Sequence, residues 1–454
     1  MGAAGTFFPI HEGYKKRPGP LEPAEPRAIL RRPMKASLID EVAKCNRCGF
    51  CLAACPVYQA TGVETKAPRG RNSLARSLMK KDFTWPSSPE TRESLFQCLG
   101  CRACVEACFP AVATDEIVAS ARSDYYREFG ETWLQRYLFR RLLPDPQRLS
   151  AAIKKAFLLK SSANLLRALS FLPWLNRNLL KAVDLLPPLP AHTLRERWPD
   201  LVRGKMGKGK KIAYFGGCAF NFVLPDIGQS TMYLLLKDGN QVFWPEHGCC
   251  GLPAYGHGDF EGARIMARKN IKLFQDLGVE AVVTECASCS SFLKKYPDLL
   301  SSEAAFIGPA KSFNSRVLDI SEFLSAKDIS FQRNDLPVKV TFHDPCHLNR
   351  FQKIKSQPRE LLKKMPGVDF VEMPEADWCC GGGAGLNLSN YDLSMKILQR
   401  KMDNVQKSKA KTLVTSCPGC YLQLRHGANK NKLAVEVRYL TEFFAGAAQA
   451  PSRE

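Results

Sequence analysis

The chain has 454 residues, too many for one ordinary hydrophobic core, so we expect two to four domains. A hydrophobic fraction of 45% and a charged fraction of 24% are typical of a soluble globular protein, and no uninterrupted apolar stretch approaches the ~20 residues that span a bilayer. The formal net charge of +21 favours an acidic partner or an anionic membrane surface. Charge alone supports nucleic-acid binding only weakly, and we expect none.

The 18 cysteines carry most of the information in this sequence. Residues 1–20 contain no apolar segment after a basic start, so we expect no signal peptide and a cytoplasmic protein. In a reducing compartment, closely spaced cysteines are metal ligands more often than disulfides. We therefore interpret the cysteines as metal ligands. Peripheral contact with the inner face of the cytoplasmic membrane is left open.

The chain divides into five segments by composition. Residues 1–37 are rich in Pro, Gly and basic residues and predict an extended arm, and residues 38–130 form a compact cysteine-rich domain. Residues 131–205 hold no cysteine and predict a basic helical connector. Its basic side chains fit an acidic partner or lipid headgroups, and a solvated helical face explains them equally well. They are Arg136, Arg140, Arg141, Lys154, Lys155, Arg167 and Lys181.

The cysteine-rich segment holds the same motif twice, Cys-x2-Cys-x2-Cys-x3-Cys. Its members are Cys45, Cys48, Cys51 and Cys55, then Cys98, Cys101, Cys104 and Cys108. This is the spacing of bacterial two-cluster ferredoxins, in which the fourth cysteine of each motif ligates the other [4Fe–4S] cubane. One cubane then takes Cys108 from the second motif, and its neighbour takes Cys55 from the first. Zinc is the alternative, but a four-ligand zinc site does not require this repeated spacing. Phe109 separates Cys108 from the usual proline and alters only the local loop.

The remaining sequence contains an internal repeat, which predicts a domain at 206–330 and a second at 331–446. Matching cysteines are offset by 128 to 131 residues, and a weaker match pairs Leu318–Leu324 with Val437–Phe444. Short apolar β-branched runs alternate with longer helical stretches such as Gly262–Leu277 and Leu393–Ser408. This alternation predicts parallel α/β units. Since cysteines follow the apolar runs directly, we expect them at the carboxyl edge of each sheet, in one metal site per copy.

Each copy contributes five cysteines in the pattern Cys-x(30–32)-Cys-Cys-x(35–36)-Cys-x2-Cys. The first set is Cys218, Cys249, Cys250, Cys286 and Cys289, and the second is Cys346, Cys379, Cys380, Cys417 and Cys420. Five thiols exceed the needs of one tetrahedral zinc or one cubane. Four ligands with a spare thiol, or a redox-active Cys-Cys pair, are the alternatives, and the repetition of all five at nearly the same spacing argues against a spare.

This pattern resembles the CCG domain of heterodisulfide reductase and its relatives. Two ferredoxin motifs followed by two such domains are similar to the iron–sulfur subunits of glycolate oxidase, of lactate-utilisation proteins and of anaerobic glycerol-3-phosphate dehydrogenase. Segments Cys45–Gln59, His343–Leu348, Trp378–Gly385 and Thr415–Leu424 favour the glycolate/lactate branch. The resemblance covers about residues 38–444. It implies a helical two-cluster ferredoxin-like domain and two tandem α/β CCG domains, an α plus α/β fold.

The resemblance also implies the cofactors and the partners. Besides two cubanes we expect one or two non-cubane [4Fe–4S] clusters. The first copy departs from the pattern of the second, because it reads GCCGLP where the second reads CCGGGAG. The sequence contains no flavin or nicotinamide motif, so we expect an FAD-containing flavoprotein partner that oxidises a 2-hydroxyacid such as glycolate or lactate. This chain then passes electrons towards a quinone, an electron-transfer flavoprotein or another acceptor, as a subunit of an oxidoreductase without a complete active site of its own.

Two other interpretations remain open. The chain could be a heterodisulfide-reductase-like subunit whose CCG clusters reduce a disulfide directly, or a zinc-stapled structural adaptor. His247, His343 and His347 lie beside expected ligands. They could relay protons or hydrogen-bond cluster sulfurs, and we expect mainly a supporting structural role.

Overall fold

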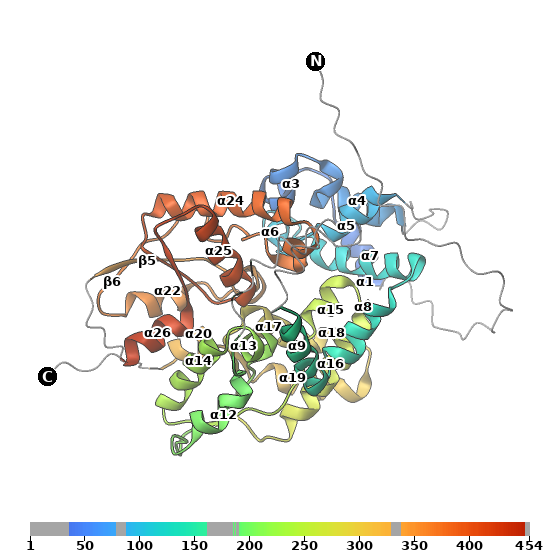
Figure 1. The fold of residues 1–454 in the computed structure, drawn as a ribbon. Helices are drawn as coiled ribbons and strands as arrows, with labels where there is room; N and C mark the ends of the chain where they lie inside the picture. The colour runs from blue at the N-terminus through green and yellow to red at the C-terminus, as the bar shows by residue number, and fades with distance from the viewer. Residues whose placement is uncertain are drawn as a thin grey trace.

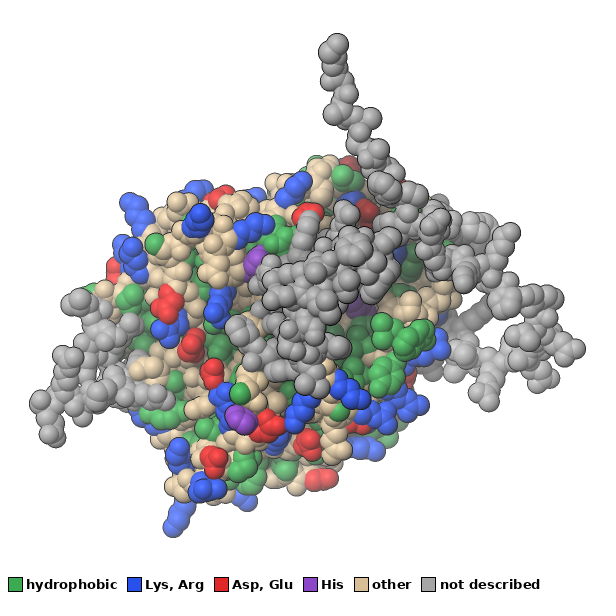
Figure 2. All heavy atoms as spheres, in the orientation of Figure 1, with side chains coloured by type: hydrophobic (Ala, Val, Ile, Leu, Met, Phe, Trp, Pro, Cys, Tyr) green, Lys and Arg blue, Asp and Glu red, His purple; other side chains and the backbone are tan. Residues whose placement is uncertain are grey.

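The computed structural model describes residues 36–78, 88–160, 185, 187, 190–327 and 337–449. Residues 1–35 of the expected arm and much of the connector, including Arg167 and Lys181, lie outside the described residues, and the last two residues of the expected arm begin helix α1. Figure 1 shows the helical N-terminal region resting on two α/β units that lie side by side. In the part described, no helix is both long and apolar enough to cross a membrane. Figure 2 shows Lys and Arg side chains distributed around the visible face among Asp and Glu.

The N-terminal region is built from short helices. They are α1 (Ala36–Ala43), α2 (Phe50–Ala54), α3 (Pro56–Thr61), η1 (Glu64–Lys66), α4 (Pro68–Leu78), α5 (Pro89–Phe96), α6 (Ala103–Glu106) and α7 (Thr114–Phe129). Helices α1, α4 and α7 pack together through Val42, Ala75 and Ile117. Only a small apolar core forms here, which is usual where metal ligands take the place of hydrophobic contacts.

The connector continues this helical region onto the first α/β unit. Its helices are α8 (Trp133–Tyr137), the π-helical turn η2 (Leu138–Leu142), α9 (Pro146–Lys160) and α12 (Leu194–Val202). Leu194 and Phe139 are buried in the same core as the first sheet. Arg140 on η2 holds Asp259 at 3.0 Å and Glu131 at 2.9 Å, so the connector is also fixed by ion pairs.

Two four-stranded parallel sheets follow, with the same strand order. The first runs β2-β1-β3-β4 and the second β6-β5-β7-β8. The strands are β1 (Lys211–Tyr214), β2 (Gln241–Phe243), β3 (Ala281–Thr284) and β4 (Val317–Asp319), then β5 (Val338–Phe342), β6 (Val368–Phe370), β7 (Thr412–Thr415) and β8 (Glu436–Tyr439). Every residue of β3 and of β7 is buried, as expected for central strands of parallel sheets. The predicted α plus α/β fold with a tandem repeat is confirmed.

Helices connect successive strands in both units. In the first they are α13 (Gly217–Phe222), α14 (Pro225–Lys237), α15 (Leu252–His257), α16 (Phe260–Gln275), α17 (Ala287–Leu293), α18 (Tyr296–Leu299), α19 (Ala304–Asn314) and α20 (Ile320–Ser325). In the second they are α21 (Cys346–Gln352), α22 (Ser356–Lys363), η4 (Gly383–Gly385), α23 (Leu386–Ser389), α24 (Tyr391–Ser408), α25 (Pro418–Lys430) and α26 (Leu440–Gln449). The weakly matched segments are confirmed as equivalent strand–helix pairs, β4–α20 and β8–α26.

The two α/β units pack against each other through buried polar contacts. The hydroxyls of Thr231 and Thr441 are 3.0 Å apart, and the Tyr439 hydroxyl donates to the Glu285 carbonyl oxygen at 2.8 Å. The Ala287 amide donates to the Ser416 carbonyl oxygen at 3.1 Å. A buried hydrogen bond fixes geometry because leaving either group unpaired is costly. The loops after β3 and β7, which carry expected ligands, are therefore held together.

Candidate metal centres

The first group of cysteines gathers between α1, α2 and the loop before α7. Burial and the neighbouring sulfurs of Cys45, Cys108 and Cys48 together raise the pKa of the Cys51 thiol to about 11, against the opposing effect of a backbone hydrogen bond from Arg69. This mutual electrostatic effect places Cys108, from the second motif, with three cysteines of the first. Cys48 is exposed, so the group lies at the surface of the molecule.

The second group is more deeply placed. Burial raises the pKa of Cys104 well above its usual value, and the sulfurs of Cys101, Cys98 and Cys55 act in the same direction. These four cysteines line one small cavity of about 20 Å³. The structure thus brings together the two cross-motif sets that the ferredoxin spacing predicts.

The backbone of the two motifs repeats as well as their cysteines. Arg47 and Gly100, each just before the second cysteine of its motif, have φ of 55° and 62°. Gly49 and Arg102, each just after it, have φ of 94° and 60°. A non-glycine residue with positive φ is uncommon. The same left-handed turn is therefore built twice, with glycine at opposite positions, to wrap the chain around each group.

The second α/β unit collects its five cysteines at the carboxyl ends of its strands. Cys346 follows β5, Cys379 and Cys380 follow β6, and Cys417 and Cys420 follow β7. The sulfurs of Cys380 and Cys420 are 3.4 Å apart. Hydrogen bonds with Cys379 and Cys420 lower the pKa of Cys380 well below its usual value, against the opposing effect of burial.

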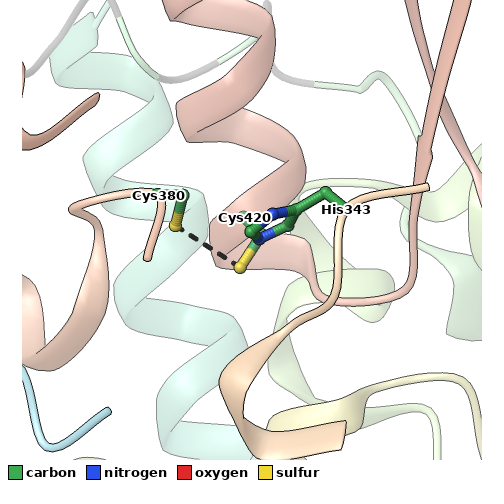
Figure 3. A group of neighbouring side chains, drawn as sticks. All are labelled: His343, Cys380 and Cys420. Atoms are coloured by element: carbon green, nitrogen blue, oxygen red, sulfur yellow. Dashed lines mark hydrogen bonds between the residues drawn. The ribbon is translucent and has the colours of Figure 1, made fainter. Parts of the chain in front are cut away.

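His343 lies beside the five cysteines of the second α/β unit (Figure 3). A ring nitrogen of His343 and the sulfurs of Cys380 and Cys420 all lie within 4.8 Å of one another. His343 is 1% exposed, and neither of its ring nitrogens has a hydrogen-bond partner among the described residues. A buried polar group left unpaired costs about 1–3 kcal/mol. The orphaned imidazole and the converging thiols therefore fit a metal–sulfur group bound between them.

The first α/β unit repeats this arrangement. Cys218 follows β1, Cys249 and Cys250 follow β2, and Cys286 and Cys289 follow β3. Hydrogen bonds with Cys249 and Cys289 lower the pKa of Cys250 to about 6. A hydrogen bond with Cys249 and burial raise the pKa of Cys218 well above its usual value. Cys289 also forms a hydrogen bond with Cys286, so all five thiols lie in one chain of contacts.

The other two histidines already have partners. His247 stacks on Phe215 with ring centroids 3.9 Å apart and accepts a hydrogen bond from the Trp244 indole at 3.3 Å. His347 stacks on Phe351 and lies 3.1 Å from the Ser291 hydroxyl. Both hold local structure, so of the three predicted histidines only His343 faces the thiols directly.

The deeper ferredoxin-type group, which contains Cys101, touches the cysteine group of the second α/β unit across the domain boundary. A hydrogen bond with Cys379 and the charge of Arg350 help lower the pKa of Cys101 to about 6, although burial opposes them. Arg350 donates to Glu106 at 3.2 Å and to Asp377 at 2.9 Å, so it bridges α6 to the second α/β unit. Arg350 was not among the residues predicted from the sequence. Its position four residues after Cys346, one helical turn along α21, is the signal that could have found it.

The two α/β groups also touch each other. The Ser288 hydroxyl lies 3.3 Å from the Cys417 sulfur. A hydrogen bond with Cys289 lowers the pKa of Cys286, but burial and the nearby Cys417 sulfur raise it overall. Three of the four cysteine groups therefore form one continuous series, in which the second ferredoxin-type group meets the second α/β unit, and that unit meets the first. The first ferredoxin-type group is tied to this series through the chain, because Cys51 and Cys55 are four residues apart.

Comparison with known families agrees with this arrangement. Residues 41–111 match the family described as 4Fe-4S dicluster domain, and residues 212–294 and 340–425 each match the Cysteine-rich domain, CCG. The fold and these matches define an iron–sulfur protein of the CCG class, with one dicluster domain and two cysteine-rich domains.

Relatives that match over most of their length identify the family within this class. The chain is 32% identical over 411 residues to the probable glycolate oxidase iron-sulfur subunit of Bacillus subtilis, covering 88% of this chain and 91% of the relative. It is 27% identical to the glycolate oxidase iron-sulfur subunit of Escherichia coli, over 87% of this chain and 93% of the relative. It is 26% identical to one of the heterodisulfide reductase subunits of Methanosarcina acetivorans, over 90% of this chain and 95% of the relative. The chain belongs to the glycolate oxidase iron–sulfur subunit family.

Proposed function

We propose that this chain is the electron-transfer subunit of a 2-hydroxyacid dehydrogenase complex, with glycolate or lactate as substrate. An FAD-containing partner would oxidise the substrate and deliver electrons to this chain, which would pass them towards a quinone or another acceptor. The observation that carries the proposal is a series of three cysteine groups joined at Cys101–Cys379 and at Ser288–Cys417, with the fourth group, around Cys51, only four residues along the chain from Cys55 of the adjacent group. Electron transfer requires carriers at short separations, and a structural zinc protein does not.

We propose the ligand sets that follow from the contacts. One ferredoxin-type cubane is held by Cys45, Cys48, Cys51 and Cys108, and the other by Cys55, Cys98, Cys101 and Cys104. A five-thiol cluster is held in each α/β unit by the cysteines after its strands. When bound, iron–sulfur groups would supply one-electron carriers whose potentials depend on hydrogen bonds and burial. We also propose that the chain is divided into five segments, with boundaries after residues 37, 130, 205 and 330.

The residues around the groups have separate roles in this proposal. Exposed Cys48 leaves the first group open to a docking flavoprotein. Arg350 holds the dicluster domain against the second α/β unit and places a positive charge beside the thiolates of Cys101 and Cys346. The buried Thr231–Thr441 and Tyr439–Glu285 contacts exclude water and fix the two α/β units.

Purification of the complex under anaerobic conditions from the native source tests the proposal. We expect a flavin-containing subunit to co-purify, and glycolate or lactate to produce the EPR signals of reduced iron–sulfur groups in this chain. A chain that carries its clusters but binds no flavoprotein, and stays oxidised with both substrates, would refute it.

A further inference from the structure

A pocket of about 220 Å³ lies beside Cys218, outside the cysteine groups described above. Its walls come from α9, from the start of α12, from α13 and from the loop after β2.

This pocket differs from a cavity built to hold a cluster. The cavity of about 20 Å³ in the dicluster domain is lined by four cysteines, whereas the larger pocket touches only Cys218. The other cysteines of the first α/β unit are buried, and Cys218 is partly exposed. Cys218 therefore forms the boundary between the thiol group and the pocket, with one side towards each.

The corresponding cysteine of the second α/β unit, Cys346, lies against the dicluster domain instead. The sulfur of Cys101 and the guanidinium of Arg350 both act electrostatically on Cys346, and Arg350 is pinned by Glu106 of the dicluster domain. The dicluster domain thus covers the second unit at the place where the first unit has its pocket. Since the two copies repeat the same fold, the first unit is open to a small molecule at the place where the second unit is covered.

The charges on the pocket walls select the kind of ligand. Lys154 pairs with Glu196 at 2.9 Å. Burial lowers the pKa of Arg195, and the negative charge of Glu246 opposes this effect. The pocket walls therefore carry two cations and two carboxylates, so their net charge is zero. A phosphate or a dicarboxylate would need a net positive charge there. The ligand that fits is therefore uncharged.

The shape and polarity of the walls narrow the ligand further. The Arg195 guanidinium lies 3.7 Å from the Trp244 ring centroid and donates to the carbonyl oxygens of Trp244 and Pro245 at 2.7 and 2.9 Å, which fixes this wall in one geometry. The Ser150 hydroxyl and the Lys154 ammonium supply polar groups on the α9 side of the pocket. Leu149 and Phe222 add apolar surface. Small-molecule sites combine such apolar walls with a few fixed polar groups. A flat, uncharged ring with carbonyl oxygens at its ends matches these walls.

We propose that this pocket binds the head group of a quinone, which accepts the electrons that leave the chain beside Cys218. The inference rests on the proposed function and assigns its acceptor site. The quinone gains two electrons and two protons, and its two carbonyl groups become the hydroxyls of the quinol. The electrons originate from the 2-hydroxyacid oxidised on the partner, and the protons come from water.

Equilibrium dialysis of menadione against the oxidised, cluster-containing full chain tests the site without the partner. Ser150→Trp places a large ring in the pocket, and we expect it to weaken binding at least about tenfold. Ser150→Ala and Ala151→Trp are the controls, because the first leaves the pocket open and Ala151 is an exposed neighbour that does not line it. Both should bind menadione as the wild type does. Lys154→Trp fills the pocket from an exposed position if Ser150→Trp does not fold.

Each result decides the matter. Saturable binding that both filling variants weaken, with unchanged cluster absorbance, supports the site. Equal binding by wild type and filling variants, or no saturable binding, overturns it, as does displacement of menadione by inorganic phosphate or by a small disulfide. Because the oxidised chain is used alone, these results are independent of whether a flavoprotein reduces it, and failure of the proposed function is seen only in the purified complex.

Discussion

A ring nitrogen of His343 and the sulfur of Cys380 lie within 4.8 Å of each other in the interior of the second α/β unit. The internal repeat makes this pair informative, because Phe215 stands at the corresponding position of the first unit. A phenyl ring cannot donate a hydrogen bond. The two five-thiol groups therefore differ by one donor, and hydrogen bonds to cluster sulfurs raise the reduction potential.

Replacing His343 with Phe, which copies the first unit, is expected to lower the reduction potential of the second five-thiol group. In the occupied site the His343 ring would donate to a cluster sulfur, and the loss of such a bond, worth about 1.4 kcal/mol, corresponds to about 60 mV for one electron. EPR-monitored redox titration of the full chain measures this shift. His347→Phe is the matched control, since His347 bonds Ser291 instead, and it should leave every potential unchanged. Equal titrations for His343→Phe and wild type would show that His343 only fills space.

Cross-motif ligation predicts which iron is lost when one cysteine is replaced. The group that contains exposed Cys48 should lose iron to a chelator faster than the buried one. Cys108→Ser is expected to remove the fast-reacting iron, and Cys55→Ser the slow-reacting iron. Iron release followed at the cluster absorbance checks this. The opposite assignment would mean that each motif holds its own cluster.

Arg350 is expected to contribute to stability as well as to electrostatics. Its side chain is 6% exposed and contacts Glu106 and Asp377. Because both carboxylates are partly exposed, Arg350→Met should cost about 2 kcal/mol of unfolding free energy, less than a fully buried pair. Lys353→Met is the control, since Lys353 pairs with the same Glu106 from an exposed position and should cost less than about 1 kcal/mol. Urea denaturation compares the two, and equal losses would exclude a special role for Arg350.

Acid should weaken the contact between the dicluster domain and the first α/β unit. His257 packs against Phe96 and Phe139, and burial, followed by the charges of Arg122 and Arg92, lowers its pKa to about 4. Between the folded value and about 6.5 in the unfolded chain, the unfolded state binds more protons, so stability falls as the pH decreases through this window.

The expected loss from this histidine is about 2 kcal/mol between pH 7 and pH 5. His257→Phe preserves the aromatic packing and removes the proton-binding group. The difference in unfolding free energy between wild type and variant isolates His257 from the thiols, which also bind protons. A difference that does not change with pH would contradict the prediction.

Much of the fold could be predicted because the repeat and its periodicity are local properties. The expected helices Gly262–Leu277 and Leu393–Ser408 correspond to α16 (Phe260–Gln275) and α24 (Tyr391–Ser408). The cysteines after each apolar run reach the carboxyl edge of their sheet because parallel α/β topology requires it.

The relations between domains could not be predicted in this way. Nothing in the sequence places Cys101 against Cys379 or Ser288 against Cys417, since each contact joins segments more than a hundred residues apart. The three histidines beside ligands look alike in the sequence, and only packing separates His343 from His247 and His347. The pocket at Cys218 combines four distant segments and has no local signature.

Iron and acid-labile sulfide analysis of the anaerobically purified chain, combined with EPR of its reduced form, tests the four-site electron relay most directly. Four [4Fe–4S] groups predict about 16 irons and a comparable amount of sulfide per chain, with spin–spin coupling between neighbouring groups. A colourless chain that contains zinc and no sulfide would contradict the relay. So would a chain with only about 8 irons in which all ten cysteines of the α/β units react with an alkylating agent.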